Sequence, residues 1–334
     1  MERQKKKITL SCKVDPFRSG WTIVEFLAHR FPYHTAARWT QRVGDQQVMV
    51  NGASIDADGA VLKDDLIQYT IFHAEPEVDF RYSVVYEDED ILAVSKSGNI
   101  PVHACGVFIT HTLISKLKES YGESINLAHR LDRETSGLVL LSKNKQAARM
   151  LGRMFQVGEV TKQYITIVQG RVPDKQFEVN APVAKVEALA SGDGLPGRQE
   201  WLDGTEEQRD KASYLPKREV NFASGKAALT RFAHVRYTGD CTVLKAVPVT
   251  GRTNQIRVHL AHHGYPVVGD KVYGLTGNVK EEAMKDGLTA RVREALVMER
   301  QALHCRALDF AHPVTAGQMR LEAPVPDDMK WAYE

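Results

Sequence analysis

The stretch NLAHRLDRETSGLVLLSKN, residues 126–144, is the most informative part of the chain. Asp132 lies at its centre, with Arg130 and Arg133 within two residues of it. A turn-forming Thr-Ser-Gly triplet follows, and then an apolar strand over residues 138–141. Because nearby guanidinium groups favour the charged form of a carboxylate, we expect Asp132 to be ionised at neutral pH. An ionised acid beside cations at the start of a strand is suited to chemistry on a nucleic acid.

Three segments further along the chain belong with this one, namely TKQYITIVQG (161–170), TGRTNQIRVHLAHHGYPVVGDKVYG (250–274) and LHCRALDFAHP (303–313). In the second of them, Arg257 alternates with the apolar residues Ile256 and Val258. This alternation predicts a strand that buries its apolar face. If Arg257 is also covered it needs an acidic partner, because an unpaired buried guanidinium costs much free energy.

In this order and separation, the four segments resemble the RluA-type pseudouridine synthases over residues 80–325. The resemblance implies an α+β fold with a mixed, mainly antiparallel sheet of the pseudouridine synthase type and a central active-site cleft. It also implies the isomerisation of specific uridines in structured ribosomal or transfer RNA to pseudouridine. That reaction breaks the N-glycosidic bond, rotates the uracil and rejoins it to the ribose through carbon. Since it involves no redox change, we expect no cofactor and no metal.

The resemblance assigns Asp132 as the catalytic aspartate, Arg257 as the basic residue that pairs with it, and Tyr164 as the tyrosine that stacks on the detached base. An arginine partner lowers the pKa of an aspartate and holds its rotamer. Base flipping costs a few kcal/mol, so Arg130 is expected to fill the space that the uridine leaves. The whole expected substrate-binding set is Arg130, Arg133, Thr135, Lys162 and Asn254.

The 250–274 segment departs from the commonest form of the family at Asn254, where many members have histidine. Asparagine still donates and accepts hydrogen bonds, so the expected role of Arg257 is unaffected. The three nearby histidines, His259, His262 and His263, do not have the spacing of a known zinc motif, and no carboxylate follows them at the required distance. We therefore predict no metal site there.

The first 75 residues predict a separate small α/β domain, followed by a linker over residues 73–79 and a catalytic domain over residues 80–334. Apolar spacing predicts helices over residues 21–32 and 35–42, and Asn51-Gly52 is a hairpin-turn signal. These elements resemble the small RNA-binding domain of ribosomal small-subunit protein four, and the matching residues are Arg38, Trp39, Arg42, Gly44, Val48, Val50, Asn51, Gly52 and Asp65. The alternative is a small packing module without RNA binding.

Composition limits the class of protein. The chain has 334 residues, 43% apolar and 26% charged, which is typical of a globular protein of about two domains. No apolar run reaches the roughly 20 residues of a membrane helix, and no secretory h-region follows the N-terminus. The four cysteines are far apart and fit a reducing cytoplasm. Net charge is only +2, so an RNA-binding protein of this composition must concentrate its cations locally. We expect a monomer.

The remaining pattern predicts helices over residues 112–121, 143–157 and 279–300, and strands within 82–96, 227–237 and 242–249. Residues 171–225 give the weakest pattern. Within them, the polar stretch 190–222 predicts a surface excursion, either solvated or in contact with RNA.

Two other functions remain open at the level of sequence. The first is an RNA-binding or assembly factor without turnover, which would not require Asp132, Tyr164 and Arg257 together. The second is a base glycosylase or glycosidase, which generally requires two cooperating acids. Glu134 is the only acid close to Asp132 in the sequence.

Overall fold

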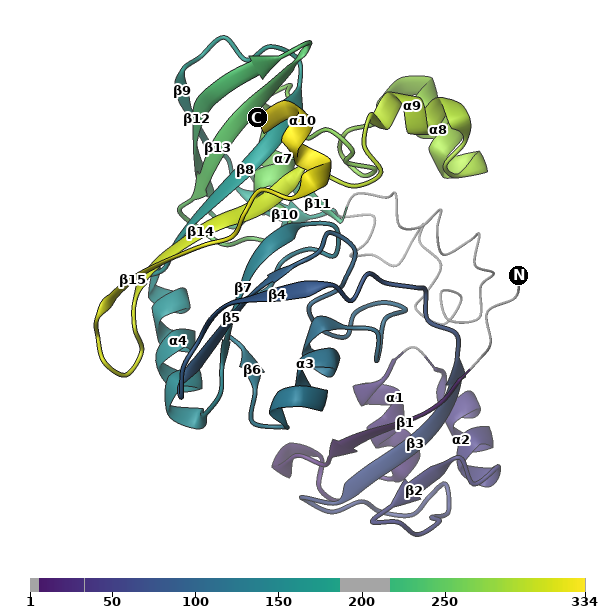
Figure 1. Cartoon of the computed structure of the whole chain (residues 1–334). Coiled ribbons are helices and arrows are strands. Elements are labelled where there is room, and N and C mark those ends of the chain that lie inside the picture. The colour runs from purple at the N-terminus through teal and green to yellow at the C-terminus, as the bar shows by residue number, and fades with distance from the viewer. Residues whose placement is uncertain (1–5, 33, 187–216, 334) are drawn as a thin grey trace. The chain divides into compact units, whose positions relative to one another are not determined.

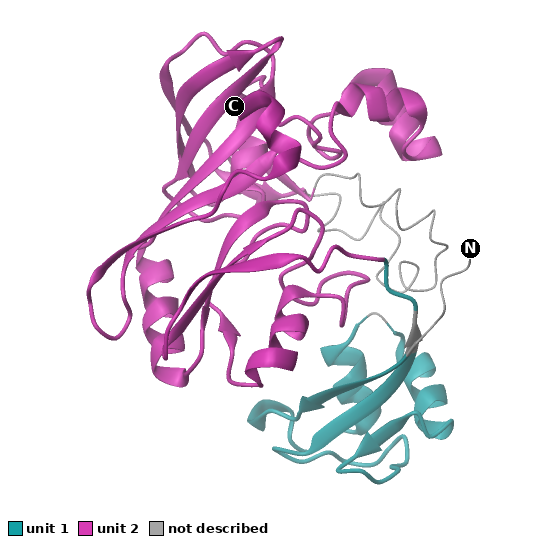
Figure 2. Cartoon of the chain, viewed as in Figure 1, with its two compact units in different colours: residues 1–76, 196–208 teal, residues 77–195, 209–334 magenta. Residues whose placement is uncertain are grey.

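The structure of the chain, a computed structural model, describes residues 6–32, 34–186 and 217–333 (Figure 1). These residues divide into two compact units, the first ending at Pro76 and the second beginning at Glu77 (Figure 2). Most of the predicted polar excursion, residues 190–216, lies outside the described residues.

The first unit has two helices and a three-stranded antiparallel sheet of order β1-β3-β2. A capping box between Thr22 and Glu25 begins the first helix, and Trp39 and Phe26 are fully buried in the core. The predicted turn is present, with Asn51 and Gly52 both at positive φ, as a tight reversal requires. The elements are β1 (Lys6–Lys13), η1 (Pro16–Arg18), α1 (Ile23–Arg30), α2 (Ala36–Gly44), β2 (Val48–Val50) and β3 (Leu66–His73).

The second unit is built on a mixed, mainly antiparallel sheet of order β4-β5-β7-β14-β8-β13-β12-β9, with β6 beside β7 and β15 beside β14. Among the described strands, only β7 and β14 pair in parallel. The α+β class expected from the sequence is confirmed. The strands are β4 (Tyr82–Glu87), β5 (Ile91–Lys96), β6 (Asn126–Leu127), β7 (Ser136–Ser142), β8 (Thr161–Gln169), β9 (Gln176–Asn180), β12 (Leu229–Thr238), β13 (Cys241–Pro248), β14 (Leu303–Ala311) and β15 (Gln318–Glu322).

Strand β7 is buried over its whole length because both faces of the sheet are covered there. Helix α4 (Lys145–Val157) packs beside it and turns Ala147, Leu151 and Met154 toward the core, at the spacing of one helix face. The Asn144 side chain accepts a hydrogen bond from the Ala147 N–H at 2.9 Å and begins the helix. This packing fixes the loop that precedes β7 at the edge of the core.

Helix α7 (Gln255–His262) replaces the strand expected around Arg257, and that prediction is wrong. Asn254 precedes the helix with a φ of 57°, in the left-handed region. Residues 255–260 are all buried, so this part of the helix is covered on all sides although it contains Gln255, Arg257 and His259. A helix covered on all sides shows no one-sided pattern of 3.6 residues, and its alternation imitates a strand.

Several elements of the second unit complete the fold. The sequence predicted the helices around residues 112–121 and 279–300, and did not predict the short strands within 171–225 or the C-terminal helix. These elements are α3 (Leu113–Tyr121), β10 (Val183–Lys185), β11 (Arg218–Val220), α8 (Gly277–Asp286), α9 (Ala290–Leu296) and α10 (Asp327–Tyr333). No helix in the described ranges combines the length and apolarity needed to cross a bilayer.

Candidate active site

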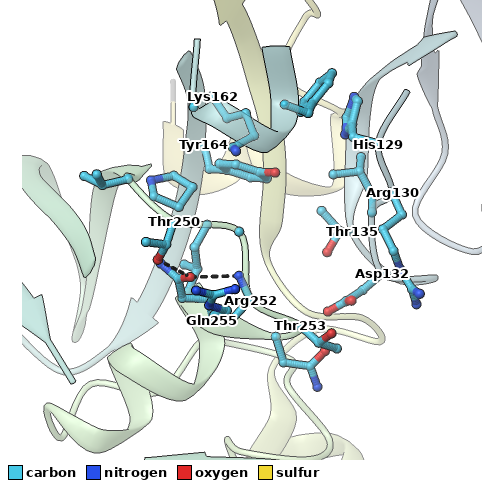
Figure 3. A pocket seen from close by; sticks show the side chains of 18 of the residues that line it. His129, Arg130, Asp132, Thr135, Lys162, Tyr164, Thr250, Arg252, Thr253 and Gln255 are labelled. Atoms are coloured by element: carbon cyan, nitrogen blue, oxygen red, sulfur yellow. Dashed lines mark hydrogen bonds between the residues drawn. The ribbon is translucent and has the colours of Figure 1, made fainter. Parts of the chain in front are cut away.

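A pocket of about 680 Å³ opens in the second unit, and three stretches of chain together with Leu303 of β14 form its walls (Figure 3). The loop before β7 contributes residues 128–132 and 135, and the turn between β13 and α7 contributes residues 248–257. The third wall contains residues 155–158 together with Lys162 and Tyr164 of β8. Ligand pockets range from about 300 to 1,000 Å³, so a nucleotide fits in this space.

Asp132 is held in the pocket by Arg257, 125 positions away in the sequence. The Arg257 Nη1 donates to Asp132 Oδ2 at 2.9 Å. The other edge of the guanidinium binds Asp270, with Nε 2.6 Å from Oδ2 and Nη2 2.8 Å from Oδ1. The guanidinium of Arg257 also lies over the aromatic ring of Tyr273, with the guanidinium carbon 5.1 Å from the ring centroid. One cation therefore orients two carboxylates.

The two carboxylates differ in exposure. The side chain of Asp270 is 0% exposed, and that of Asp132 is 26% exposed. Burial alone would raise the pKa of Asp270, but Arg257 and the N–H groups of Val272 and Tyr273 hold that pKa below its ordinary value. Burial alone would lower the pKa of Arg257, and the two acids raise it above its usual range. Because Asp270 takes the bidentate edge, Asp132 is oriented without having its charge fully cancelled.

Asn254 contacts the same carboxylate from a second side. Its Nδ2 lies 3.3 Å from Asp132 Oδ1 and 3.2 Å from Oδ2, and its Oδ1 accepts from the Tyr273 hydroxyl at 3.2 Å. This orientation of the amide follows from chemistry, because an ionised carboxylate only accepts hydrogen bonds and the NH2 group must face it. Asn254 was expected to bind substrate. It lines the pocket, and its amide is directed at Asp132.

Tyr164 of β8 lines the pocket and is buried. Burial, together with a hydrogen bond to the Cys305 thiol, raises the pKa of Tyr164 well above its ordinary value. Burial also raises the pKa of Cys305 to about 12, so both groups are neutral at physiological pH. The phenol is therefore equipped to present a flat face and an O–H group, and is poorly suited to lose its proton.

Lys162 lies two residues before Tyr164 and also lines the pocket, with its Nζ 5.8 Å from the centroid of the Phe155 ring. Partial burial lowers the pKa of Lys162. The His129 ring stacks on the same Phe155 ring, with centroids 4.9 Å apart, and its Nε2 accepts a hydrogen bond from the Leu140 N–H. Desolvation and Lys162 lower the pKa of His129, so its ring is neutral and serves as a wall and an acceptor.

The pocket brings together some of the other predicted residues and excludes one. Arg130 and Thr135 line it, and Arg130 is exposed, with Nη1 3.1 Å from His103 Nε2. Arg133 does not line the pocket. Its guanidinium pairs with Glu134 at 3.0 Å and lies over the Phe108 ring. Arg130 and Arg133 thus point in different directions, and the expected contact of Arg133 with substrate stays a prediction that would lie outside this pocket.

Glu134, the acid closest to Asp132 in the sequence, does not line the pocket either. It accepts hydrogen bonds from Lys271 at 2.7 Å and from Arg133 at 3.0 Å. Burial alone would raise the pKa of Glu134, but Lys271 and Arg133 hold it below its ordinary value. The carboxylate is thus a fixed anion in a structural ion pair, and a two-acid mechanism has no support from this geometry.

Four side chains behind the loop were not recognised in the sequence, and each binds its backbone or a residue of its turn. The Lys96 Nζ donates to the Arg133 carbonyl at 3.0 Å, and the Arg300 Nη1 donates to the Glu134 carbonyl at 3.1 Å. The Gln301 Nε2 donates to Thr135 Oγ1 at 2.6 Å, and Lys271 binds the Glu134 carboxylate. The four side chains that hold this loop are therefore Lys96, Lys271, Arg300 and Gln301. They fix the backbone on which Asp132 stands.

Arg300 links this loop to the C-terminal helix α10. Its Nε and Nη2 bind the two carboxylate oxygens of Asp328 at 2.6 and 2.7 Å. Gly98 makes room for the arginine, since a Cβ at that position would lie 2.3 Å from its side chain. Gly98, which follows a strand that ends in lysine, was the only sign of this packing in the sequence. A glycine alone does not indicate which distant side chain packs against it.

Helix α7 contains two histidines, and the fully buried one, His259, has a structural role. His259 contacts Thr230 Oγ1 and the Ala181 carbonyl, both at 2.9 Å. Within the described ranges, one group has the geometry of a metal site, and it consists of Asp88, Asp90 and His312. His312 Nδ1 accepts from the N–H of residues 314 and 315, so its Nε2 bears the proton that Asp88 accepts at 3.0 Å. Those hydrogen bonds already use the ligand atoms, and none of the three residues lines the pocket.

Comparison with known proteins gives a consistent picture. Residues 90–262 match the family model described as RNA pseudouridylate synthase. The chain is 30% identical to the ribosomal large subunit pseudouridine synthase D of Pseudomonas aeruginosa, over 95% of this chain and 92% of that protein. It is 29% identical to the uncharacterized RNA pseudouridine synthase YlyB of Bacillus subtilis, over 92% and 91%. It is also 29% identical to the mitochondrial tRNA pseudouridine(32) synthase of Saccharomyces cerevisiae, over 75% of this chain and 50% of that protein.

Solved structures resemble the fold. The human RNA pseudouridylate synthase domain containing 1 aligns with a TM-score of 0.54 at 24% identity, over 78% of this chain and 89% of that one. The human RNA pseudouridylate synthase domain containing 4 aligns with a TM-score of 0.52 at 20% identity, over 75% and 90%. At these identities the likeness is one of fold.

Proposed function

Since the chain belongs to the RNA pseudouridylate synthase family, we propose that it isomerises specific uridines of a structured ribosomal or transfer RNA to pseudouridine, with Asp132 as the catalytic carboxylate. The observation that supports this most directly is the pair of Asp132 and Arg257 at the wall of a nucleotide-sized pocket. Relatives named for ribosomal and for transfer RNA are both similar to the chain, so both remain candidate substrates.

In this proposal Asp132 acts on the ribose of the flipped uridine, as a nucleophile or as the base that removes a proton. Both roles require an ionised oxygen at a defined place. Arg257 holds Oδ2, and Asn254 holds the carboxylate plane from another side. The partly exposed Asp132 can therefore meet the nucleotide in one orientation, which lowers the entropy cost of reaching the transition state.

Tyr164 is proposed to stack on the uracil after the glycosidic bond breaks. A flat ring limits how far the free base moves while it rotates, and the neutral hydroxyl can donate a hydrogen bond. The raised pKa of Tyr164 argues against a role as a proton-accepting phenolate. Proton removal from the rejoined carbon is more compatible with Asp132 or a water than with this group.

The remaining pocket cations are proposed to bind the RNA around the target nucleotide. Arg130 is exposed beside Asp132 and suits the space vacated by the flipped uridine. Lys162 and Arg252 line the pocket near Tyr164 and at the 248–257 turn, where they suit phosphate or uracil oxygens. Asn254 remains within reach of substrate through the same pocket wall.

The first unit is proposed to bind RNA, in keeping with its likeness to the domain of ribosomal small-subunit protein four. Not every cationic residue that matches that domain is exposed for RNA binding. Arg42 is buried, donates to the Thr70 carbonyl and lies over the Trp39 ring, so it stabilises the domain. Arg38 is exposed and bonded to Gln41, and is the better candidate for an RNA contact. The same proposal describes a cytoplasmic, monomeric enzyme whose redox-neutral reaction requires no metal or cofactor.

The test is the purified protein with RNA from a strain that lacks its gene, followed by mapping of modified positions. We expect pseudouridine at a small set of uridines and no free uracil. Release of uracil would indicate a glycosylase instead, and tight binding without any change in the RNA would indicate a binding factor. The missing positions in RNA from the deletion strain should be the same ones that the purified protein restores.

A further inference from the structure

Helix α4 presents a row of three exposed cations, Lys145, Arg149 and Arg153, which we call the α4 cation row. Residues four positions apart lie on the same helix face, and neighbours in the row are separated by a rise of about 6 Å. The opposite side of the helix packs against the core through Ala147 and Leu151. The row is therefore held at a fixed place on a rigid element.

Among the described residues, no acid pairs with this row. The α4 sequence, KQAARMLGRMFQV, contains no aspartate or glutamate. In the described part of the chain, none of the three cations forms an ion pair with a carboxylate. On helix α3, by contrast, Lys116 pairs with Glu119 and Lys118 pairs with Glu123. The α4 cation row thus differs from an ordinary solvated helix face, where charges of both signs alternate.

Helix stability does not explain the row. The first turn of a helix has a partial positive charge, which favours acids and disfavours cations. Lys145 is the first residue of α4, and the first turn contains no acid. Arg153 is nearer the C-terminal end, where the dipole favours a cation. A lysine at the start of the helix therefore has no local benefit and suggests an anionic partner outside the chain.

The row leads to the pocket. The C-terminal end of α4 and the cap residue Gly158 line it, through residues 155–158. Lys162 and Arg252 add two cations at the pocket itself. From Lys145 to the end of the helix the distance is about 18 Å, at 1.5 Å per residue. The positive charge is therefore continuous from the pocket wall to the far end of α4.

We propose that the α4 cation row binds the ribose-phosphate backbone of the substrate RNA on one side of the uridine that enters the pocket. The proposal rests on the proposed function, since it names where that RNA runs. A spacing of one helix turn is of the same order as that of successive phosphates along an RNA strand. Phosphate contacts of this kind position the strand and contribute affinity that depends on salt. They are equal in the ground and transition states, so they affect KM and not kcat.

The test compares two variants with the same change in net charge. The first replaces the row, as Lys145→Gln, Arg149→Gln and Arg153→Gln, and glutamine is a good helix former. The control makes Lys285→Gln, Arg291→Gln and Arg293→Gln on helices α8 and α9, whose residues do not line the pocket. Binding of a fluorescent oligouridylate is measured over a range of salt concentrations, and pseudouridine formation is measured on RNA from the deletion strain.

For the row variant we expect the slope of log affinity against log salt to become shallower by about 2, since each single-strand phosphate contact contributes about 0.7. KM should rise at least about ten-fold at near-physiological salt, with kcat unchanged. The control variant should keep the wild-type slope and KM. The proposal is overturned by an unchanged slope and KM in the row variant, by an equal loss in the control, or by a fall in kcat alone. Failure of the wild type to form pseudouridine would refute the proposed function, while the salt slopes would still test the RNA path.

Discussion

Two acids share the guanidinium of Arg257, and the regions that hold them differ in burial and in how each acid binds that cation. Asp270 lies in the turn after α7, fully buried, with both oxygens on Arg257 and two backbone N–H groups bound as well. Asp132 lies in the loop before β7, partly exposed, with one oxygen on the same cation. The buried acid supplies the countercharge that keeps the arginine in place, and the exposed acid is left with an oxygen for a ligand.

The strongest test of this contrast is Asp132→Asn. Removal of the ionised oxygen should reduce kcat by about 10⁴-fold or more, as for loss of an essential catalytic group. RNA affinity and the unfolding midpoint should change little, since Arg257 keeps its bidentate partner. Turnover, RNA binding and urea unfolding measured on one preparation check all three. Pseudouridine formation at near the wild-type rate would remove Asp132 from its role.

Asp270→Asn should have the opposite profile. It leaves the buried guanidinium of Arg257 with only a partly exposed countercharge, and breaking a buried ion pair typically costs about 3–5 kcal/mol. The variant should unfold at much lower urea concentration, and its activity should fall because Asp132 loses its fixed partner. Asp132→Asn is the matched control. Equal stability of the two variants would contradict the division between a structural and a reactive acid.

The same contrast has a pH signature. The pKa of Asp270 is below its ordinary value in the folded protein, so its contribution to stability is present above the unfolded pKa of about 3.9. That contribution is lost as the pH falls through the depressed folded pKa. Wild type should therefore lose stability steeply in acid, and Asp270→Asn should lose less over the same range. Parallel acid-unfolding curves for the two proteins would show that Asp270 is not the group concerned.

Substitutions of Asn254, which contacts Asp132, should reduce kcat by less than Asp132→Asn does. Asn254→Ala removes a neutral donor to Asp132, and a hydrogen bond to a charged group contributes about 1.5–3 kcal/mol, so kcat should fall roughly ten- to hundred-fold. Asn254→Asp places a second carboxylate against the first and should move the acidic limb of the pH–rate profile upward, since like charges favour protonation. Asn254→His, which keeps a donor, should recover part of the activity. A change in KM alone across the series would indicate substrate binding instead.

Lys96 gives the smallest expected effect, because it acts through the backbone of the loop. Burial, followed by Arg300, lowers the pKa of Lys96 to about 7, with Asp132 opposing and Arg133 adding smaller effects. The unfolded lysine has a pKa of about 10.4, so between these values the unfolded chain binds more protons and this residue makes the folded state more stable as pH rises. Urea unfolding of wild type and Lys96→Met at pH 6.5 and pH 9 should show the difference shift in favour of wild type at the higher pH. A constant difference would mean that Lys96 stays charged.

The sequence predicted an element best where a periodic face or a clear turn marks it. Helix α4 follows the expected pattern because its apolar residues repeat on one side, and strands β4 and β5 are marked by the acidic turn between them. Helix α7 was predicted as a strand because its residues 255–260 are buried on all sides and show no single period. The strands within residues 171–225 are short and lie at the edge of the sheet or in a small two-stranded sheet, where few apolar residues are required.

The site was predictable only in part, for a related reason. A resemblance identified Asp132, Tyr164 and Arg257, but no local pattern shows that an arginine 125 positions away reaches an aspartate. The partners that fix them are further from any local signal. Asp270 reads as an ordinary turn residue, and Arg300 reads as one more surface cation. The roles of Asp270 and Arg300 depend on burial and on which carbonyl or carboxylate the fold places within reach. The spacing of residues along the sequence indicates neither of these.

The parallel pairing of β7 with β14 has a consequence for how the enzyme becomes competent. It joins the part of the sheet that contains β4, β5 and β7 to the part that contains β14, β8 and β13, through two residue pairs, Ser136 with His304 and Gly137 with Cys305. Gly137 has a φ of 104°, and a Cβ there would lie 2.3 Å from the Cys305 carbonyl oxygen, so the two backbones approach as closely as only glycine allows. Asp132 precedes this junction, whereas Tyr164 and Arg257 come from strands and helices beyond it. The pocket is therefore complete only when these distant segments meet, and we expect bound RNA that touches both sides to slow amide hydrogen exchange at this junction more than elsewhere in the sheet.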